Sequence, residues 1–414
     1  MITHRFNSSA KNPPLAIIVI ALFAALMLII TSGANWMPNL SAHKQATVKA
    51  RASTSASASH SGAFEMETSN TTASLRGIHA VPGTGVAWAS GANGTVLRTE
   101  DSGYVWQTCA VPPGAEKLDF RAIWGWEANT AVAMSSGPGD QSRLYKTTDG
   151  CSHWKLTYAN PDPKGFWDAM AFDDSQTGTI LGDPVDGSFK IMNFADINFP
   201  NYRQFQVWAA TGPTAVVGQA AFAASNSALI QLPDSEAPNR LMVDSSTWVG
   251  VGGTGGSRVF RAIHRFRMSD HEGSPGMIVS RDWLSVPIPL ASGTDSSGVF
   301  SLAFRDPQHG MAAGGDYAKP NDPAGTAAWT ADGGKTWTAA TKPPHGYRSA
   351  VAWDEADKLW ITVGTNGADI SRDDGRTWTP IDNGNWNAIS LPWVVSPTGR
   401  IAKLISLNLR QTKP

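Results

Sequence analysis

A four-residue pattern, apolar–any–small–apolar, recurs along the chain, and a strand-like run of small and apolar residues follows each copy. Two irregular copies begin at Gly218 ("GQAAFAAS") and Gly298 ("GVFSLAF"). The runs that follow read, for example, "VAWASG", "AVAMSS" and "WITVGT". Short apolar or alternating runs bounded by turn residues are typical of β-strands. The regular copies are Leu75-Arg76-Gly77-Ile78, Phe120-Arg121-Ala122-Ile123, Trp167-Asp168-Ala169-Met170, Tyr347-Arg348-Ser349-Ala350 and Trp386-Asn387-Ala388-Ile389.

A second repeated element, an octet of the form Ser/Thr-x-Asp-x-Gly-x-x-Trp, follows further along several of these units. Asp and Gly close together form turns, because the carboxylate accepts backbone N–H groups and Gly adopts positive φ without strain. The Trp then begins the returning strand and buries a large ring. We therefore interpret the Asp and Trp residues as structural. The octets span residues 99–106, 147–154, 330–337 and 371–378, with Asp101, Trp106, Asp149, Trp154, Asp332, Trp337, Asp373 and Trp378 at the shared positions.

Together these elements predict an all-β fold, a β-propeller. Four antiparallel strands recur about every 40–50 residues, which is the spacing of propeller blades. We predict seven four-stranded blades. The long fourth unit is interpreted as one blade with an insertion near Pro233–Val243 rather than as two blades. The final unit lacks an outer strand, and residues 63–68 ("AFEMET") are expected to supply it and close the ring, which removes exposed sheet edges.

Composition agrees with many short strands and turns. The 414 residues include 40 Gly, 26 Pro and 17 Trp, and 42 % are hydrophobic. A net charge of −1 gives no general attraction to nucleic acid or anionic membranes. The chain has no phosphate-binding glycine loop and no metal-spaced Cys/His cluster, so we expect neither a cofactor nor a metal.

The N-terminal region predicts export. Arg5 and Lys11 precede a continuous apolar run from Leu15 to Ile30, and Ser32-Gly33-Ala34 offers a cleavage site. Residues 1–34 are therefore a signal peptide or a single transmembrane anchor, with residues 15–31 as the membrane segment. Residues 35–61 are rich in Ala and Ser and predict a flexible tether to a propeller at 62–414. The bulk of the chain is expected in the periplasm or another extracytoplasmic space.

The two cysteines fit an oxidising compartment. Cys109 follows the first octet and Cys151 lies inside the second. If neighbouring repeats stack in register, a disulfide between them would contribute about 3–4 kcal/mol. The alternative is a pair of buried free thiols.

The octets resemble the Asp-box, or BNR repeat, of bacterial sialidases and other propellers. Over most of the chain the sequence is similar to the photosystem II stability/assembly factor-like family of exported propellers. The stretches that carry this resemblance are "LRGIHAV", "LDFRAIW", "FWDAMAF", "LGDPVDG", "AAFAASNSAL" and "DDGRTW". The resemblance implies a non-catalytic accessory protein that binds a membrane-protein precursor.

The variable residue of the four-residue pattern is expected to line the central channel. The candidates are Arg76, Arg121, Asp168, Arg348 and Asn387, with Ser301 in the fifth unit and Gln219 or Ala220 in the fourth. Guanidinium groups suit carboxylate or phosphate ligands. The alternative is a solvated channel without a ligand. In "GDPVDG", Asp183 and Asp186 are expected to form a turn rather than a metal site.

Two functions compete. The first is a non-enzymatic scaffold that binds a protein partner or a small anionic ligand. The second is a sialidase-type glycoside hydrolase, which needs three arginines, a Tyr nucleophile with its Glu base and an acidic proton donor. Tyr347 is expected to point into its blade, no Glu falls near an inner strand, and no second acid is apparent opposite Asp168. The sequence therefore favours binding over catalysis.

Overall fold

The structure, a computed structural model, describes residues 62–172, 177–199, 202–233, 242–267, 277–278, 282–405 and 407. The predicted leader or anchor and the predicted tether lie outside these residues. The described residues form β-strands and one short 3-10 turn, η1 (Gly139–Gln141). None of them forms a helix that is long and apolar enough to cross a membrane.

Five of the sheets in the described part of the chain are antiparallel and four-stranded. Their strands are β2 (Leu75–Ala80), β3 (Ala87–Gly91), β4 (Val96–Thr99) and β5 (Gln107–Thr108); β6 (Phe120–Gly125), β7 (Ala131–Ser135), β8 (Arg143–Thr147) and β9 (Lys155–Ala159); β10 (Trp167–Phe172), β11 (Thr177–Val185), β12 (Ser188–Phe199) and β13 (Tyr202–Ala210); β24 (Ala350–Asp354), β25 (Leu359–Gly364), β26 (Gly367–Ser371) and β27 (Thr379–Asp382); and β28 (Ala388–Ser390), β29 (Trp393–Val395) and β30 (Ile401–Leu404) with β1 (Phe64–Glu67).

The remaining strands belong to one hydrogen-bonded sheet of ten. They are β14 (Gln219–Ala220), β15 (Leu229–Pro233), β16 (Met242–Gly253), β17 (Arg258–Arg267), β18 (Met277–Ile278), β19 (Trp283–Pro287), β20 (Ser297–Phe304), β21 (Gly310–Asp316), β22 (Ala327–Thr330) and β23 (Thr338–Ala339). Strands β15, β16, β17 and β19 pair in one set and β20–β23 in another, and a Gly252–Gly298 bridge joins the two sets. The count of seven blades stays a prediction. So does the insertion near Pro233–Val243, because residues 234–241 are not described.

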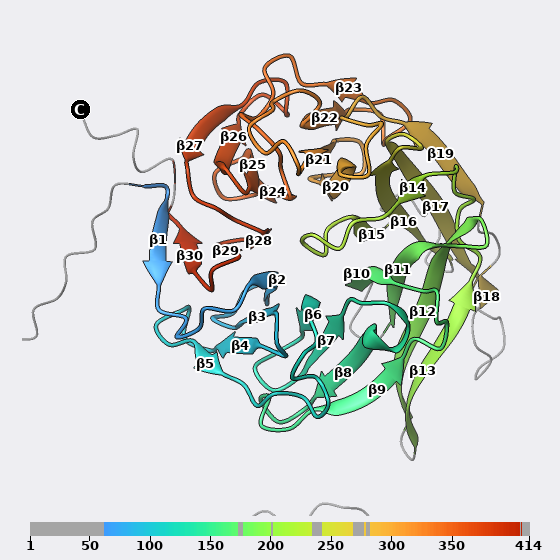
Figure 1. The fold of residues 1–414 in the computed structure, drawn as a ribbon, viewed down its shortest axis with the longest axis vertical. Helices are drawn as coiled ribbons and strands as arrows, with labels where there is room; N and C mark the ends of the chain where they lie inside the picture. The colour runs from blue at the N-terminus through green and yellow to red at the C-terminus, as the bar shows by residue number, and fades with distance from the viewer. Residues whose placement is uncertain are drawn as a thin grey trace, which may run out of the picture. The chain divides into compact units, whose positions relative to one another are not determined.

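The sheets are arranged around a common axis, with β2, β6, β10, β15, β20, β24 and β28 nearest the centre (Figure 1). The predicted ring closure is confirmed. Strand β1, near the start of the described chain, pairs antiparallel with β30 at its end, from Phe64 opposite Leu404 to Glu67 opposite Ile401. The predicted all-β propeller class is thereby confirmed.

Deleting residues 1–61 is expected to leave a soluble, cooperatively folding propeller, because β1 and the ring closure are retained. Circular dichroism melting and size-exclusion chromatography would test this. A matched deletion of residues 1–68 removes β1 and leaves the edge of β30 unpaired, so that variant is expected to aggregate. Aggregation of the shorter deletion would mean that residues 1–61 are needed to cover the domain.

The four octets share one hydrogen-bond pattern. In the first, the Asp101 carboxylate accepts the Thr99 hydroxyl at 2.8 Å and the Val105 N–H at 3.0 Å, and the Thr99 hydroxyl accepts the Gly103 N–H at 3.0 Å. Asp149, Asp332 and Asp373 accept the corresponding N–H groups at 3.0, 3.0 and 2.9 Å. Each aspartate therefore stabilises its own turn.

The octet tryptophans pack between neighbouring sheets. Trp106 meets Trp393 of the last sheet edge-to-face at 5.4 Å, and Trp154 lies in one cluster with Trp88 of the preceding sheet. The four rings are between 0 and 9 % exposed. They therefore join adjacent sheets as well as anchoring their own turns.

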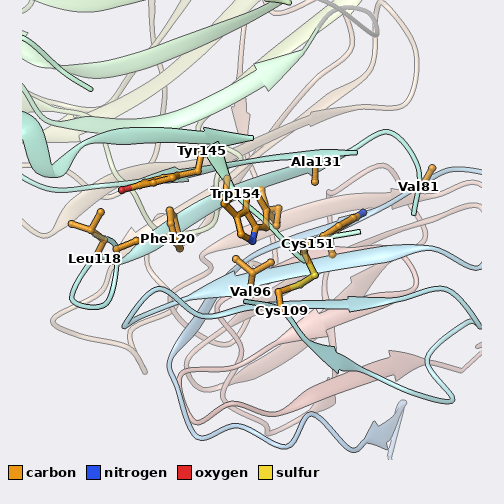
Figure 2. Close-up of a cluster of buried hydrophobic side chains, with 13 residues drawn as sticks. Val81, Val96, Cys109, Leu118, Phe120, Ala131, Tyr145, Cys151 and Trp154 are labelled. Atoms are coloured by element: carbon orange, nitrogen blue, oxygen red, sulfur yellow. A yellow bond between two sulfur atoms is a disulfide. The ribbon is translucent and has the colours of Figure 1, made fainter. Parts of the chain in front are cut away.

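The first two sheets are also joined covalently. Cys109 follows β5, Cys151 lies in the next octet, and the two form a disulfide with Cα atoms 5.3 Å apart (Figure 2). Cys151 has a φ of 66°, where the other octets have glycine. A non-glycine residue is unfavourable in this left-handed conformation. The disulfide gives a physical reason for the exception.

Candidate functional site

Four of the strands nearest the centre carry a bulge at the same place. The register of β2, β6, β10 and β20 against their partners skips one residue, which is Arg76, Arg121, Asp168 and Phe300 respectively. The next residue is small in all four strands, and at Gly77 an added Cβ would lie 2.4 Å from the Ser90 hydroxyl. The four-residue pattern therefore specifies a bulge, and bulges re-aim side chains near functional sites.

The bulged residues line one cavity of about 500 Å³, a size typical of ligand sites. Four predicted candidates lie there: Arg76, Arg121, Asp168 and Asn387. Asn387 also donates to the Leu75 carbonyl at 2.7 Å, which ties the last sheet to the first. The other lining residues include Phe166, Asp183, Phe222, Phe300, Tyr317, Tyr347 and Ser349.

Arg76 and Arg121 share a carboxylate. Asp119 Oδ2 lies 2.8 Å from Arg121 Nε and 3.8 Å from Arg76 Nε. Burial lowers the pKa of Arg76, the neighbouring Arg121 lowers it further, and Asp119 opposes both effects. Two guanidiniums against one carboxylate leave a net positive charge on this wall. Asp119 was not among the sequence candidates, although it lies two residues before Arg121.

Two carboxyl groups also line the cavity. Asp168 is 2 % exposed, and burial raises its pKa well above the ordinary range; the nearby Asp183 raises it further, and Arg121 lowers it. Burial also raises the pKa of Asp183, whose carboxyl accepts the Ala221 N–H at 3.0 Å. Asp183 is therefore a second acid near Asp168, which was not apparent from the sequence.

Asp183 and Asp186 do not act as a pair. Asp183 lies in β11 and faces the cavity, whereas Asp186 has a φ of 55° at the β11–β12 turn and lies 3.8 Å from Lys164. Within the described residues, no three His, Cys, Asp or Glu side chains are placed to hold a metal ion.

Aromatic rings form another part of the lining. Phe222 stacks on Phe300 at 4.0 Å, and Tyr347 meets Phe300 edge-to-face at 4.8 Å. Burial raises the pKa of Tyr347 despite the favourable charge of Arg76. The expectation that Tyr347 points into its blade is wrong, because it lines the cavity.

Arg348, the remaining candidate, does not line the cavity. It is fully buried and pairs with the equally buried Asp369, to which Arg348 Nε donates at 2.8 Å. Its Nη1 donates to Asn366 Oδ1 at 2.6 Å, and its Nη2 lies 2.9 Å from His345 Nδ1. The expectation that Arg348 supplies a third guanidinium to the channel is therefore wrong. Arg348 belongs to a buried hydrogen-bond network instead.

Arg348 lies away from the cavity because the segment before β24 pairs with β25 one residue out of the expected register. The Ser349 N–H bonds to the Val363 carbonyl, and Val363 also pairs with Ala350. Ser349 therefore takes the bulge position, and Arg348 takes the preceding position, where β2 and β6 have Leu75 and Phe120. The register of β20 also differs by one residue, so its bulge residue is Phe300 rather than the expected Ser301. The expected Ser301 is fully buried and accepts the Ser227 hydroxyl at 2.7 Å.

The fourth unit contributes a loop instead of a continuous inner strand. After β14 the chain leaves the sheet at residues 221–228, which we name the channel loop, and reaches toward the centre of the ring (Figure 1). Asn226 Oδ1 accepts the Met170 N–H at 2.7 Å, and the Ser225 hydroxyl donates to the Ser349 carbonyl at 2.6 Å. The sequence expectation of a strand from Gly218 holds only for Gln219–Ala220.

Known proteins match this chain by structure. No protein-family model matches the sequence, and no curated protein matches it. A solved structure described as "YCF48 bound to D1 peptide" matches with a TM-score of 0.50 at 13 % identity, over 83 % of this chain and 97 % of that chain. "Structure of U3-55K" matches with a TM-score of 0.50 at 10 % identity, over 83 % and 98 %. "YCF48 from Cyanidioschyzon merolae" has a TM-score of 0.36 at 14 % identity, over 82 % and 98 %.

The fold is that of a β-propeller. YCF48 is a photosystem II assembly factor, so this structural neighbour falls in the family that the sequence resembles. At sequence identities of 13 and 10 %, the structural similarity to these proteins establishes the fold alone.

Proposed function

We propose that this chain is a non-catalytic propeller scaffold that binds a segment of a protein partner in its central cavity. One observation carries the proposal: Arg76 and Arg121 lie together on one wall of the cavity, with Asp119 shared between them. Such a pair suits a carboxylate, because guanidinium presents a fork of N–H donors. The cavity would therefore hold the C-terminal carboxylate of the bound segment.

The structural neighbour supports this class of ligand. The YCF48 structure is described as bound to a D1 peptide, which makes a peptide segment a physically reasonable occupant of a propeller of this kind. A membrane-protein client is the partner class that the resemblance implies.

Peptides with a free C-terminal carboxylate are expected to bind more tightly than their amides. Full-length protein would be immobilised and exposed to two pools of randomised pentapeptides, one of free acids and one of amides, with retained peptides identified by mass spectrometry. For a retained peptide, Arg121→Gln should weaken binding by about 1–3 kcal/mol, or roughly 5- to 150-fold in Kd, and added salt should weaken it further.

The control for this experiment is Arg258→Gln on β17, which does not line the cavity and bonds to Ser285 at 3.1 Å. It should bind peptides as the wild type does. Equal retention of acids and amides, or no retention of either pool, would overturn the proposal.

A sialidase-type glycoside hydrolase is the second candidate, since Tyr347 and two carboxyl groups line the same cavity. Two features count against it. Arg348 is held by Asp369, so the three-arginine carboxylate site is incomplete, and burial of Tyr347 opposes the ionisation that a nucleophile needs. Turnover of an aryl glycoside by the wild type that disappears in Tyr347→Phe would establish this candidate instead.

We also propose that the chain is exported to an extracytoplasmic space and is secreted or anchored through residues 15–31. The apolar run in the N-terminal region supports this proposal. The disulfide between Cys109 and Cys151 supports it as well, because such bonds persist in oxidising compartments.

A further inference from the structure

Asp168, which lines the cavity, carries a buried polar atom without a partner. Its carboxyl is 2 % exposed, and among the described residues its Oδ2 finds no hydrogen-bond partner. An unsatisfied buried carboxyl oxygen is costly, and the cost is greatest when the group is ionised. Because Asp168 also lines the cavity, a ligand there is in a position to supply the missing partner.

The charges around Asp168 favour a cation as that partner. Asp183 is the carboxyl whose charge acts most strongly on Asp168. Arg121 is the neighbouring cation, but its own hydrogen bonds go to Asp119 at 2.8 Å and to the Ala223 carbonyl of the channel loop at 3.0 Å. Asp168 and Asp183 thus lie near each other in the cavity lining. Among the described residues, no guanidinium donates a hydrogen bond to Asp168.

The remaining lining suits the stem of a long basic side chain. Phe166, Phe222 and Phe300 line the same cavity as Asp168. Apolar rings cover methylene groups, and the faces of aromatic rings attract ammonium and guanidinium groups. Burial disfavours the ionised form of both carboxyl groups, and a bound cation opposes that effect, whereas a neutral donor does not.

We propose that the Asp168 wall is a specificity pocket for a lysine or arginine side chain of the bound segment. This inference rests on the proposed function: the segment would place a carboxylate at Arg76 and Arg121 and a basic side chain at Asp168. The cavity then selects peptides that carry both charges, and it rejects peptides that carry the carboxylate alone.

The retained free-acid pool should be enriched in lysine or arginine over the input pool. A retained lysine peptide would then be compared with its norleucine analogue, which has the same apolar stem without the ammonium group. Norleucine is expected to weaken binding to the wild-type full-length protein by at least about tenfold, the scale of one charge-assisted hydrogen bond. In Asp168→Asn the two peptides should bind within about twofold of each other.

The matched control is Asp186→Asn, which removes a carboxylate at an exposed turn outside the cavity and should keep the lysine preference. No basic enrichment, or equal binding of the lysine and norleucine peptides by the wild type, would overturn the inference without needing any variant to fold. The acid-against-amide preference tests the proposed function separately. A third outcome is that n-butylammonium binds to the wild type and not to Asp168→Asn, while no peptide is retained. That result would show that the cation is a small amine and would overturn the inference of a peptide ligand.

Discussion

Replacing Trp378 by alanine is expected to lower the free energy of unfolding by about 3–5 kcal/mol. The ring is fully buried between the sheets of β20–β23 and β24–β27, in one cluster with Met311 and Trp360. Its Nε1 also donates to the Gly375 carbonyl of its own octet at 3.1 Å. Alanine would therefore leave a cavity at a sheet interface and remove a hydrogen bond that closes the turn.

Urea unfolding followed by circular dichroism would measure this change. Trp337→Ala should fall in the same range but cost less, because Trp337 is 9 % exposed. Trp208 on β13 is 43 % exposed and provides the control, with an expected cost under about 1 kcal/mol for Trp208→Ala. Unchanged unfolding midpoints for both octet variants would show that these tryptophans are not core anchors.

Replacing Asp369 by alanine is expected to cost a similar 3–5 kcal/mol. Asp369 and Arg348 are both fully buried, so the variant leaves an uncompensated guanidinium inside the sheet. The pair itself need not be a net source of stability, because desolvation of both charges offsets much of their attraction. The double variant Arg348→Leu/Asp369→Ala should therefore recover much of the loss, since Leu75 occupies the equivalent position on β2.

Two comparisons make this prediction specific. Lys164 and Asp186 form an exposed pair at 3.8 Å, and Lys164→Ala should cost at most about 1 kcal/mol. The folded double variant should bind peptides as the wild type does, because Arg348 does not line the cavity. An Asp369→Ala protein as stable as the wild type would contradict the buried ion pair.

The fold class could be predicted from the sequence because its signals are local. The Asp and Gly residues of an octet specify one turn within eight residues, and the four-residue pattern specifies one bulged strand. Because these patterns repeat along the chain, the same turns and strands recur in successive sheets around the ring. The closing strand at Phe64–Glu67 was predictable for a related reason: the last unit lacked one strand, and an unpaired edge is unfavourable.

The candidate site could be predicted only in part. Arg76, Arg121 and Asp168 were found because a polar residue inside an apolar pattern marks the bulge in each strand. Arg348 was misplaced because the pattern in "YRSA" fits two registers one residue apart. Local sequence cannot choose between them, since the choice depends on Asp369, 21 residues away, which compensates the buried charge.

The sequence alone determined that strands of this kind repeat and where they turn, because both depend on neighbours along the chain. Only the tertiary structure decided which side chains meet at the centre. Asp183 and the channel loop join the site through contacts between different sheets, such as the bond from Arg121 to the Ala223 carbonyl. Asp119 bonds locally to Arg121, but its approach to Arg76 also crosses to the neighbouring sheet. The charge and shape of the cavity therefore depend on packing around the ring, which no single repeat encodes.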